Sequence, residues 1–288
     1  MATVSEVLIP VEDIQLSGLL ATACGKPRAV IIALHGGGMR ATYFHGQQHP
    51  DLSLLTLGAQ LGYTVLALDR PGYGASHGLA FERGRIANQA NMIFAALDHF
   101  ARDHDIGAGF FIVSHSFGMK VAIAMAAHAR GHELLGIEAT GAGLRYDPEQ
   151  LYLFEDMNAP RPKGLERSLF WGPEALYPEG TFAPGVRPIA DVPDIEKDES
   201  TRWPNLLPEF AARARIPIHL TIAEHERWWD FTTAAQDTLR ELFANTPHFS
   251  ISAQPRAGHN ISLGKSARAY HLKVLAFAEE CVLARTAI

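Results

Sequence analysis

Cysteine is nearly absent from this sequence, which has only Cys24 and Cys281 among its 288 residues. So few cysteines exclude the dense disulfide framework of a small secreted domain. One disulfide between the two is compatible with the sequence, but two separate thiols fit a reducing cytoplasm at least as well. We therefore expect a cytoplasmic protein that folds around a hydrophobic core.

Long apolar runs and basic clusters are also missing. The longest apolar stretches, such as residues 29–34, are far too short to span a bilayer. The first residues carry Glu6, Glu12 and Asp13 and lack a basic start followed by an apolar stretch, so they do not resemble a signal peptide. The formal net charge is -6, whereas a nucleic-acid-binding protein favours a face rich in Lys and Arg. We expect neither a nucleic-acid partner nor a membrane association.

Apolar material is plentiful, because 47% of the residues are hydrophobic and only 19% are charged. Short apolar runs alternate with longer helical patterns, which indicates an α/β fold with a mostly parallel central sheet flanked by helices. Residues 6–10 and 14–21 alternate apolar and polar side chains and predict an antiparallel hairpin. Further strands are expected at residues 29–35, 63–68, 109–113, 135–139, 218–222 and 249–252, and helices at residues 52–61, 85–101, 117–130, 232–243 and 266–283.

Proline and aromatic residues interrupt this rhythm between residues 144 and 212. Segments of this length without clear periodicity are usually functional lids or disordered linkers. Large apolar residues such as Phe154 and Leu169 argue against disorder. We therefore predict a core formed by residues 1–143 and 213–288, with residues 144–212 inserted as a cap between two late core strands.

The segment Ser114-His115-Ser116-Phe117-Gly118 lies between a predicted strand and a predicted helix. A sharp turn at this point lifts the Ser116 hydroxyl out of the backbone at the carboxyl end of the sheet. Strand and helix nearly touch at such a turn, so small residues are needed two positions before and after the serine. The segment fits the nucleophile-elbow pattern G-x-S-x-G, with Ser114 in place of the first glycine. The alternative is a plain strand–helix junction with a capping serine.

Three consecutive glycines, Gly36-Gly37-Gly38, follow the strand predicted at residues 29–35. Without side chains, such a loop lets backbone N–H groups face a ligand at close range. An oxyanion that develops during a reaction needs preorganised donors of this kind. We assign one donor to the N–H of Gly37, with Gly38 as a further contact to substrate, and the second donor to the N–H of Phe117.

A base and an orienting acid are also needed to activate the serine. His259 is favoured among fourteen histidines because its loop follows the last predicted strand and precedes the last helix. Three carboxylates compete for the acid after the strand at residues 218–222, and we rank Glu226 first, Asp230 second and Glu224 third. The alternative for each is a solvated loop carboxylate, the usual fate of Asp and Glu.

Together these segments resemble the α/β-hydrolase superfamily over residues 5–143 and 213–285. The stretch Asp69-Arg70-Pro71-Gly72-Tyr73-Gly74-Ala75-Ser76 is similar to the D-x-P/R-G-x-G-x-S turn that these proteins carry after an early strand. Each motif alone is unspecific, but four motifs occur in the family's order, each at the end of a predicted strand. The sequence departs from the family pattern at Ser114 and, by one methylene, at Glu226.

The resemblance implies a serine hydrolase with a Ser116–His259–Glu226 triad. Such an enzyme cleaves a carboxylic ester, or a related thioester or lactone, through an acyl-enzyme. It requires no metal and no organic cofactor. His45 and His49 lie four residues apart but lack the H-E-x-x-H pattern, so we expect no metal site.

Three of the tryptophans are candidates for contacts with the substrate. Trp171 in the predicted cap, with Trp228 and Trp229 beside the acid, suggests a small-molecule substrate with an apolar or aromatic body. Packing of the cap onto the core is an equally good explanation for these side chains.

Other functions are compatible with the same fold. It also supports lyases, acyltransferases and cyclases of biosynthetic pathways, and a non-catalytic ligand-binding protein is a further alternative. A homodimer formed through the cap is compatible with the sequence as well.

Overall fold

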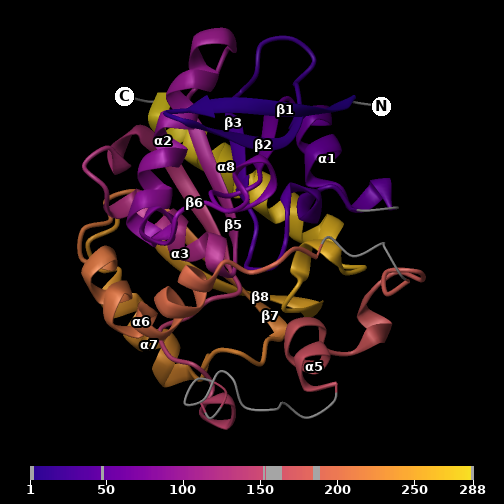
Figure 1. Cartoon of the computed structure of the whole chain (residues 1–288), viewed down its shortest axis with the longest axis vertical. Coiled ribbons are helices and arrows are strands. Elements are labelled where there is room, and N and C mark those ends of the chain that lie inside the picture. Colours follow the sequence, from indigo (N-terminus) through magenta and orange to yellow (C-terminus); the bar gives the residue numbers. More distant parts are fainter. Residues whose placement is uncertain (1–2, 47–48, 152, 154–163, 184–188, 287–288) are drawn as a thin grey trace.

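A single mixed sheet organises the computed structural model, which describes residues 3–46, 49–151, 153, 164–183 and 189–286 (Figure 1). Its eight strands follow the order β1-β2-β4-β3-β5-β6-β7-β8. The pairs β1–β2 and β2–β4 are antiparallel, and the remaining pairs are parallel. The strands are β1 (Val4–Val11), β2 (Ile14–Ala21), β3 (Val30–Leu34), β4 (Thr64–Leu68), β5 (Phe110–His115), β6 (Leu134–Thr140), β7 (Ile218–His225) and β8 (Phe249–Gly258).

Helices cover both faces of this sheet. The central strand β3 is buried at every position, and its alternate side chains enter two different hydrophobic clusters. One cluster packs against α2 and α3, and the other packs against α1 and α8. The helices are α1 (Leu54–Gln60), α2 (Ile86–Asp103), α3 (Phe117–Ala127), α5 (Leu165–Trp171), α6 (Asp194–Ala211), α7 (Thr233–Leu242) and α8 (Ala267–Thr286).

The architecture confirms the fold class expected from the sequence. Every predicted strand is present, because solid apolar runs such as β3 are stable only where helices cover both faces of a parallel sheet. The largest difference in length is at β8, which continues to Gly258.

Helix α6 is the main element that the sequence pattern does not predict. Pro204 and Pro208 lie inside it, although proline usually interrupts a helix. Pro204 has no N–H for the carbonyl of Ser200, and the hydroxyl of Tyr146 donates to that carbonyl instead at 2.8 Å. A tertiary contact therefore satisfies the backbone group that the proline leaves open.

The described residues between β6 and β7 include α5, in pink-red in Figure 1, and α6, in orange. Trp203 of α6 is fully buried, and its indole N–H donates to the carbonyl of Gly143 at 2.8 Å. This contact ties α6 to the loop that leaves β6. Phe154 and most of residues 152–163 lie outside the described residues, so the extent of a cap stays a prediction.

The two cysteines are free thiols, with Cys24 exposed and Cys281 buried. Within the described residues, no helix is both long and apolar enough to cross a membrane.

The parallel arrangement of the strands brings the loops that follow them to one edge of the sheet. Strands β3 to β8 run parallel, so their carboxyl ends share one edge. The loops after β3, β5, β7 and β8 contain the glycine run, Ser116, Glu226 and His259, respectively. In open α/β sheets, ligands bind at this edge.

Candidate active site

Ser116 occupies a strained turn between β5 and α3. Its backbone has φ 53° and ψ -117°, a left-handed region that non-glycine residues rarely adopt. The N–H of Ser116 donates to the carbonyl of Thr140 at 2.7 Å, which anchors the turn to β6. Backbone strain at a turn of this kind is typical of functional sites.

The residues on either side of the turn show why small side chains are needed. A Cβ on Gly118 would lie 2.2 Å from the carbonyl oxygen of Leu34, so no larger residue fits there. Ser114 is fully buried, and its hydroxyl donates to the carbonyl of Glu138 at 3.0 Å. Serine replaces glycine at this position without leaving a buried polar group unpaired.

His259 and Glu226 form a buried pair at the same sheet edge. Nδ1 of His259 lies 2.7 Å from Oε2 of Glu226, and the two side chains are only 2% and 3% exposed. Oε1 of Glu226 accepts the N–H groups of Arg227 and Trp228 at 3.0 and 2.9 Å. Because Nδ1 donates to the carboxylate, Nε2 carries the lone pair and is able to act as a base.

The two competing carboxylates have other partners. Oε2 of Glu224 accepts the N–H of Arg256 at 2.5 Å, and Oδ1 of Asp230 accepts the N–H of Thr232 at 2.9 Å. The structure thus brings Glu226, and neither of its neighbours, to the imidazole of His259.

His35 braces the glycine loop. Its Nε2 accepts the N–H of Arg70 at 3.0 Å, and its Nδ1 lies 2.8 Å from the carbonyl oxygen of Gly36. Burial, assisted by the charge of Arg70, lowers the pKa of His35 to about 3, so the ring is neutral. A neutral ring with Nδ1–H satisfies both contacts.

The backbone N–H groups of Gly37 and Gly38, in the loop after β3, differ in their hydrogen bonding. The N–H of Gly38 donates to the hydroxyl of Tyr73 at 3.0 Å and is therefore engaged within the protein. Gly37 is partly exposed, and the N–H of Phe117, at the first position of α3, has no acceptor inside its own helix. The N–H groups of Gly37 and Phe117 stay the candidate oxyanion donors.

Ser116 itself is partly exposed. Within the part of the chain that the structure describes, its hydroxyl makes no hydrogen bond. Contacts between nucleophile and base are often long in unliganded enzymes and tighten when substrate binds.

Aromatic side chains pack around the site. Trp171 contacts Tyr177 edge to face at 5.2 Å between ring centroids, and Trp229 stacks on Tyr146 at 4.2 Å. Both tryptophans are at most 5% exposed, so packing accounts for their positions.

Trp228 lies nearer to the reacting groups. Its ring packs against Phe170 at 4.8 Å, and the Phe170 ring lies 5.9 Å from that of His259. Phe170, at the end of α5, is therefore the aromatic side chain that lies between Trp228 and the candidate base.

A buried polar network beside the glycine loop was not predicted from the sequence. Nη1 of Arg70 donates to Glu196 at 2.6 Å, and the hydroxyl of Tyr73 donates to the same carboxylate at 2.9 Å. Oε2 of Glu196 lies 3.2 Å from the position of a Cβ on Gly37. Arg70 and Tyr73 lie in the recognised turn after β4, but no local signal marks Glu196.

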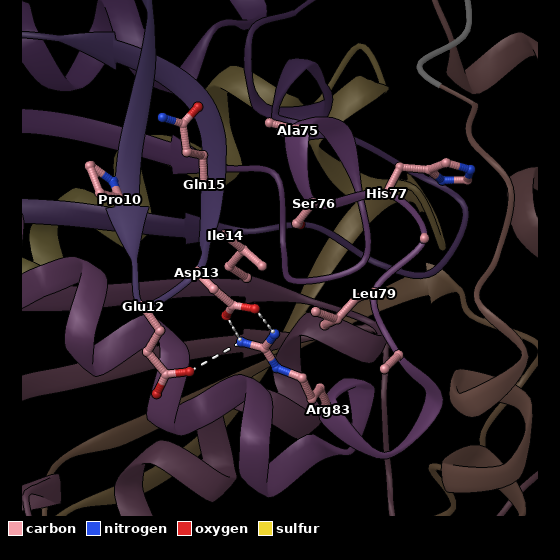
Figure 2. Close-up of a pocket in the computed structure, with 12 residues that line it drawn as sticks. Pro10, Glu12, Asp13, Ile14, Gln15, Ala75, Ser76, His77, Leu79 and Arg83 are labelled. Atoms are coloured by element: carbon pink, nitrogen blue, oxygen red, sulfur yellow. Dashed lines mark hydrogen bonds and ion pairs between the residues drawn. The ribbon is translucent and has the colours of Figure 1, made fainter.

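A surface hollow of about 630 Å³ lies away from these residues (Figure 2). It is lined by the β1–β2 turn and the loop after β4, and Arg83 bridges Glu12 and Asp13 within it at 3.1 and 2.8 Å. Ser76 and His77 also line it, but the Ser76 hydroxyl accepts the N–H of Gly72 and donates to the carbonyl of Tyr73, so it is engaged within the protein. Among the described residues, no three His, Cys, Asp or Glu side chains converge to hold a metal ion.

Comparison with solved structures shows the fold. Monoglyceride lipase from Saccharomyces cerevisiae matches with a TM-score of 0.70 and 14% identity over 98% of this chain and 96% of that chain. A carboxyl esterase from Bacillus coagulans matches with a TM-score of 0.65 and 16% identity over 98% and 99%. A variant of potato epoxide hydrolase matches with a TM-score of 0.67 and 15% identity over 96% and 100%.

Sequence comparison identifies the family. No curated protein matches the chain. Residues 31–269 match the model of the alpha/beta hydrolase family, a range that begins in β3 and ends in α8. With this match and the sheet described above, the chain belongs to the alpha/beta hydrolase family.

Proposed function

We propose that this protein is a serine hydrolase that cleaves a carboxylic ester, or a related thioester or lactone, through an acyl-enzyme on Ser116. The observation that carries the proposal is the strained Ser116 turn at the sheet edge that also holds the buried His259–Glu226 pair. In this proposal, three loops at that edge supply the nucleophile, the base and the orienting acid.

The first half of the reaction forms the acyl-enzyme. Oγ of Ser116 attacks the carbonyl carbon while Nε2 of His259 takes the hydroxyl proton. The N–H groups of Gly37 and Phe117 stabilise the tetrahedral oxyanion, a contribution of about 2.7–4 kcal/mol for each donor. The intermediate collapses, the bond to the leaving group breaks, and His259 returns the proton to the departing alcohol or thiol.

The second half releases the acid. His259 takes a proton from water, whose oxygen attacks the acyl carbon, and the proton returns to Ser116 as the acid leaves. Glu226 keeps the imidazole in the Nδ1–H tautomer and stabilises the imidazolium formed in each half. The two backbone N–H groups on its other oxygen hold this carboxylate in place.

The substrate class follows from the side chains near His259. Phe170 and Trp228 are the large apolar groups on that side, which supports a small-molecule substrate with an apolar or aromatic body. We propose that residues 144–212 act as a cap, because Phe170 belongs to this segment and contacts the base.

Serine at position 116 supports acyl chemistry over the opening of an epoxide. An epoxide hydrolase of this fold uses an aspartate at the nucleophile position, and a carboxylate there forms an alkyl-enzyme ester. A serine alkoxide suits a carbonyl carbon instead, since an oxyanion site is available to the developing charge.

The test compares wild type with Ser116→Ala on p-nitrophenyl esters and acyl thioesters of increasing chain length. We expect turnover by wild type, loss of activity in Ser116→Ala, and covalent labelling of wild type alone by a fluorophosphonate. Ser5→Ala, which changes an exposed serine on β1, serves as the matched control. Equal activity of wild type and a folded Ser116→Ala would reject the proposal.

A second set of assays tests whether the enzyme transfers the acyl group to an acceptor other than water. Adding alcohols or amines to the reaction reports whether the acyl group passes to an acceptor other than water. Product analysis then distinguishes a hydrolase from an acyltransferase.

A further inference from the structure

The side chain of His115, the residue before Ser116, is enclosed by loops that surround the serine. It is 2% exposed. A Cβ on Gly36 would lie 2.8 Å from its Nδ1, and a Cβ on Gly141 would lie 3.0 Å from its Nε2. These two glycines leave the space that the ring fills, because a side chain at either position would collide with it.

The imidazole reaches the main chain of the candidate base. Nε2 of His115 lies 2.9 Å from the carbonyl oxygen of His259, and the two rings are 4.8 Å apart between centroids. A carbonyl oxygen only accepts, so Nε2 carries the proton and Nδ1 does not. This hydrogen bond joins the residue before the nucleophile to the residue that would activate it.

A second contact holds the same loop. Tyr43 stacks on His115 with 4.6 Å between centroids and 21° between planes. The hydroxyl of Tyr43 accepts the N–H of Ser262 at 3.4 Å, three residues after His259. The His115–Tyr43 stack thus contacts the loop of His259 at two backbone groups.

The electrostatic state of His115 suits this role. Burial, followed by the neighbouring charge of His259, lowers the pKa of His115 well below the ordinary value, so the ring stays neutral. The charged Arg70 also disfavours a cation on this ring, and His35, the other titratable group nearby, is neutral. A cation at residue 115 would oppose the imidazolium that forms on His259 in the proposed reaction.

We propose that His115 is a positioning residue: its neutral imidazole holds the backbone of His259 and thereby sets the base against Ser116. The inference rests on the proposed serine hydrolase function. His115 does not touch substrate and acts only through His259.

The test uses two replacements of similar size. His115→Gln keeps an N–H donor that reaches the same carbonyl, and His115→Leu removes it. We expect His115→Leu to lower kcat on the order of 100-fold with little change in KM, because a small displacement of a catalytic group has this effect. His115→Gln should recover most of that loss. Thermal unfolding and circular dichroism check that both variants fold.

A second readout does not depend on turnover. In spectra of ¹⁵N-histidine-labelled protein, the His259 imidazole signals should shift or broaden in His115→Leu and stay near wild type in His115→Gln. A folded His115→Leu with wild-type kcat and unchanged His259 signals would overturn the inference, as would equal impairment of both variants. If folded wild type lacks esterase activity, the proposed function fails. Unchanged His259 signals in a folded His115→Leu would separately reject the positioning.

Discussion

Glu226 holds His259 with one carboxylate oxygen, at 2.7 Å from Nδ1, and uses the other oxygen to accept two backbone N–H groups of its own loop. The backbone therefore holds the carboxylate independently of its contact with the imidazole. A fixed acceptor of this kind determines both the orientation of the ring and its tautomer. It also shows how a glutamate, one methylene longer than the aspartate common in this family, reaches the imidazole of His259.

Replacement of this carboxylate by an amide provides the first prediction. Glu226→Gln should lower kcat about 10³–10⁴-fold, because the amide stabilises the wrong tautomer of His259. Ester hydrolysis followed with a p-nitrophenyl substrate measures the change. Glu224→Gln is the matched control and should stay near wild type, since Glu224 contacts the N–H of Arg256 instead. A strong loss in Glu224→Gln with activity retained in Glu226→Gln would reverse the assignment.

The glycine loop provides the second prediction. Gly36→Ala places a Cβ 2.8 Å from the His115 ring and 2.9 Å from Cβ of Ser116, so the elbow has to shift. We expect a loss of kcat on the order of 100-fold and a destabilisation of about 1–3 kcal/mol. Gly37→Ala meets only a carboxylate oxygen at 3.2 Å and should be milder. Kinetics and urea unfolding of both variants decide the order, and the reverse order would contradict the packing described.

The third prediction concerns the ion pair between Arg70 and Glu196, whose side chains are 0% and 2% exposed. Arg70→Met leaves a buried carboxylate without its cation and should cost about 3–5 kcal/mol of unfolding free energy. The matched control is Arg130→Met, whose partners are 43–50% exposed, and it should cost less than about 1 kcal/mol. Urea unfolding measures both. The double variant Arg70→Met/Glu196→Gln should recover part of the loss, and a full additive loss would contradict this explanation.

The fourth prediction follows from His219, which lies 2.7 Å from Glu138. Burial alone would lower the pKa of His219, but the hydrogen bond and charge of Glu138 outweigh it and raise the pKa. The folded state therefore binds this proton more tightly than the unfolded state. The stabilisation is complete below the ordinary histidine pKa and is lost as the pH rises through the raised value.

Unfolding of wild type and His219→Gln by urea at several pH values tests this linkage. The advantage of wild type should decrease as the pH rises above the ordinary histidine value near 6.5. A difference that is constant with pH would show that Glu138 does not stabilise the protonated ring.

The fifth prediction concerns Lys120, which lies one turn after Ser116 on α3 and donates to Ser200 at 3.0 Å. Its ammonium lies among the rings of Phe117, Trp203 and Trp229 at 5.3–5.7 Å. Burial lowers the pKa of Lys120 to about 7. Between pH 7 and its ordinary value of 10.5, the unfolded chain binds the proton more tightly, so stability rises with pH.

Lys120→Met removes this cost. At pH 6 the variant should be more stable than wild type by about 1–4 kcal/mol, as found when buried charges are replaced by apolar side chains. The advantage should shrink toward pH 10, because neutral Lys120 keeps its hydrogen bond to Ser200. Unfolding midpoints across this range measure the effect, and an advantage that grows with pH would contradict it.

Much of the core could be predicted from the sequence for a local reason. A strand such as β3 is apolar at every position because both of its faces are covered, and that pattern is visible within five residues. The elbow is likewise visible, because Gly118 must leave room for the carbonyl of Leu34. The order of serine, acid and histidine could also be read, since each follows a predicted strand.

Other features depend on residues that are distant in the sequence. Helix α6 contains two prolines that predict an interruption, and the Tyr146 hydroxyl, 54 residues from Ser200, donates to the carbonyl that Pro204 leaves open. The engagement of Gly38 by Tyr73, and of Tyr73 by Glu196, has no local pattern either. Hydrogen bonds of this kind form because the fold brings distant residues together, so the local sequence does not predict them.

The sequence by itself determined the sheet, the elbow and a short list of candidate residues, because these depend on side-chain periodicity and on sterics within a few residues. Only the tertiary structure shows which of Glu224, Glu226 and Asp230 contacts His259. Those carboxylates are chemically alike, and the choice rests on which loop geometry brings an oxygen to Nδ1 of His259. The packing of His115 against His259 was decided in the same way, by a contact across 144 residues of chain.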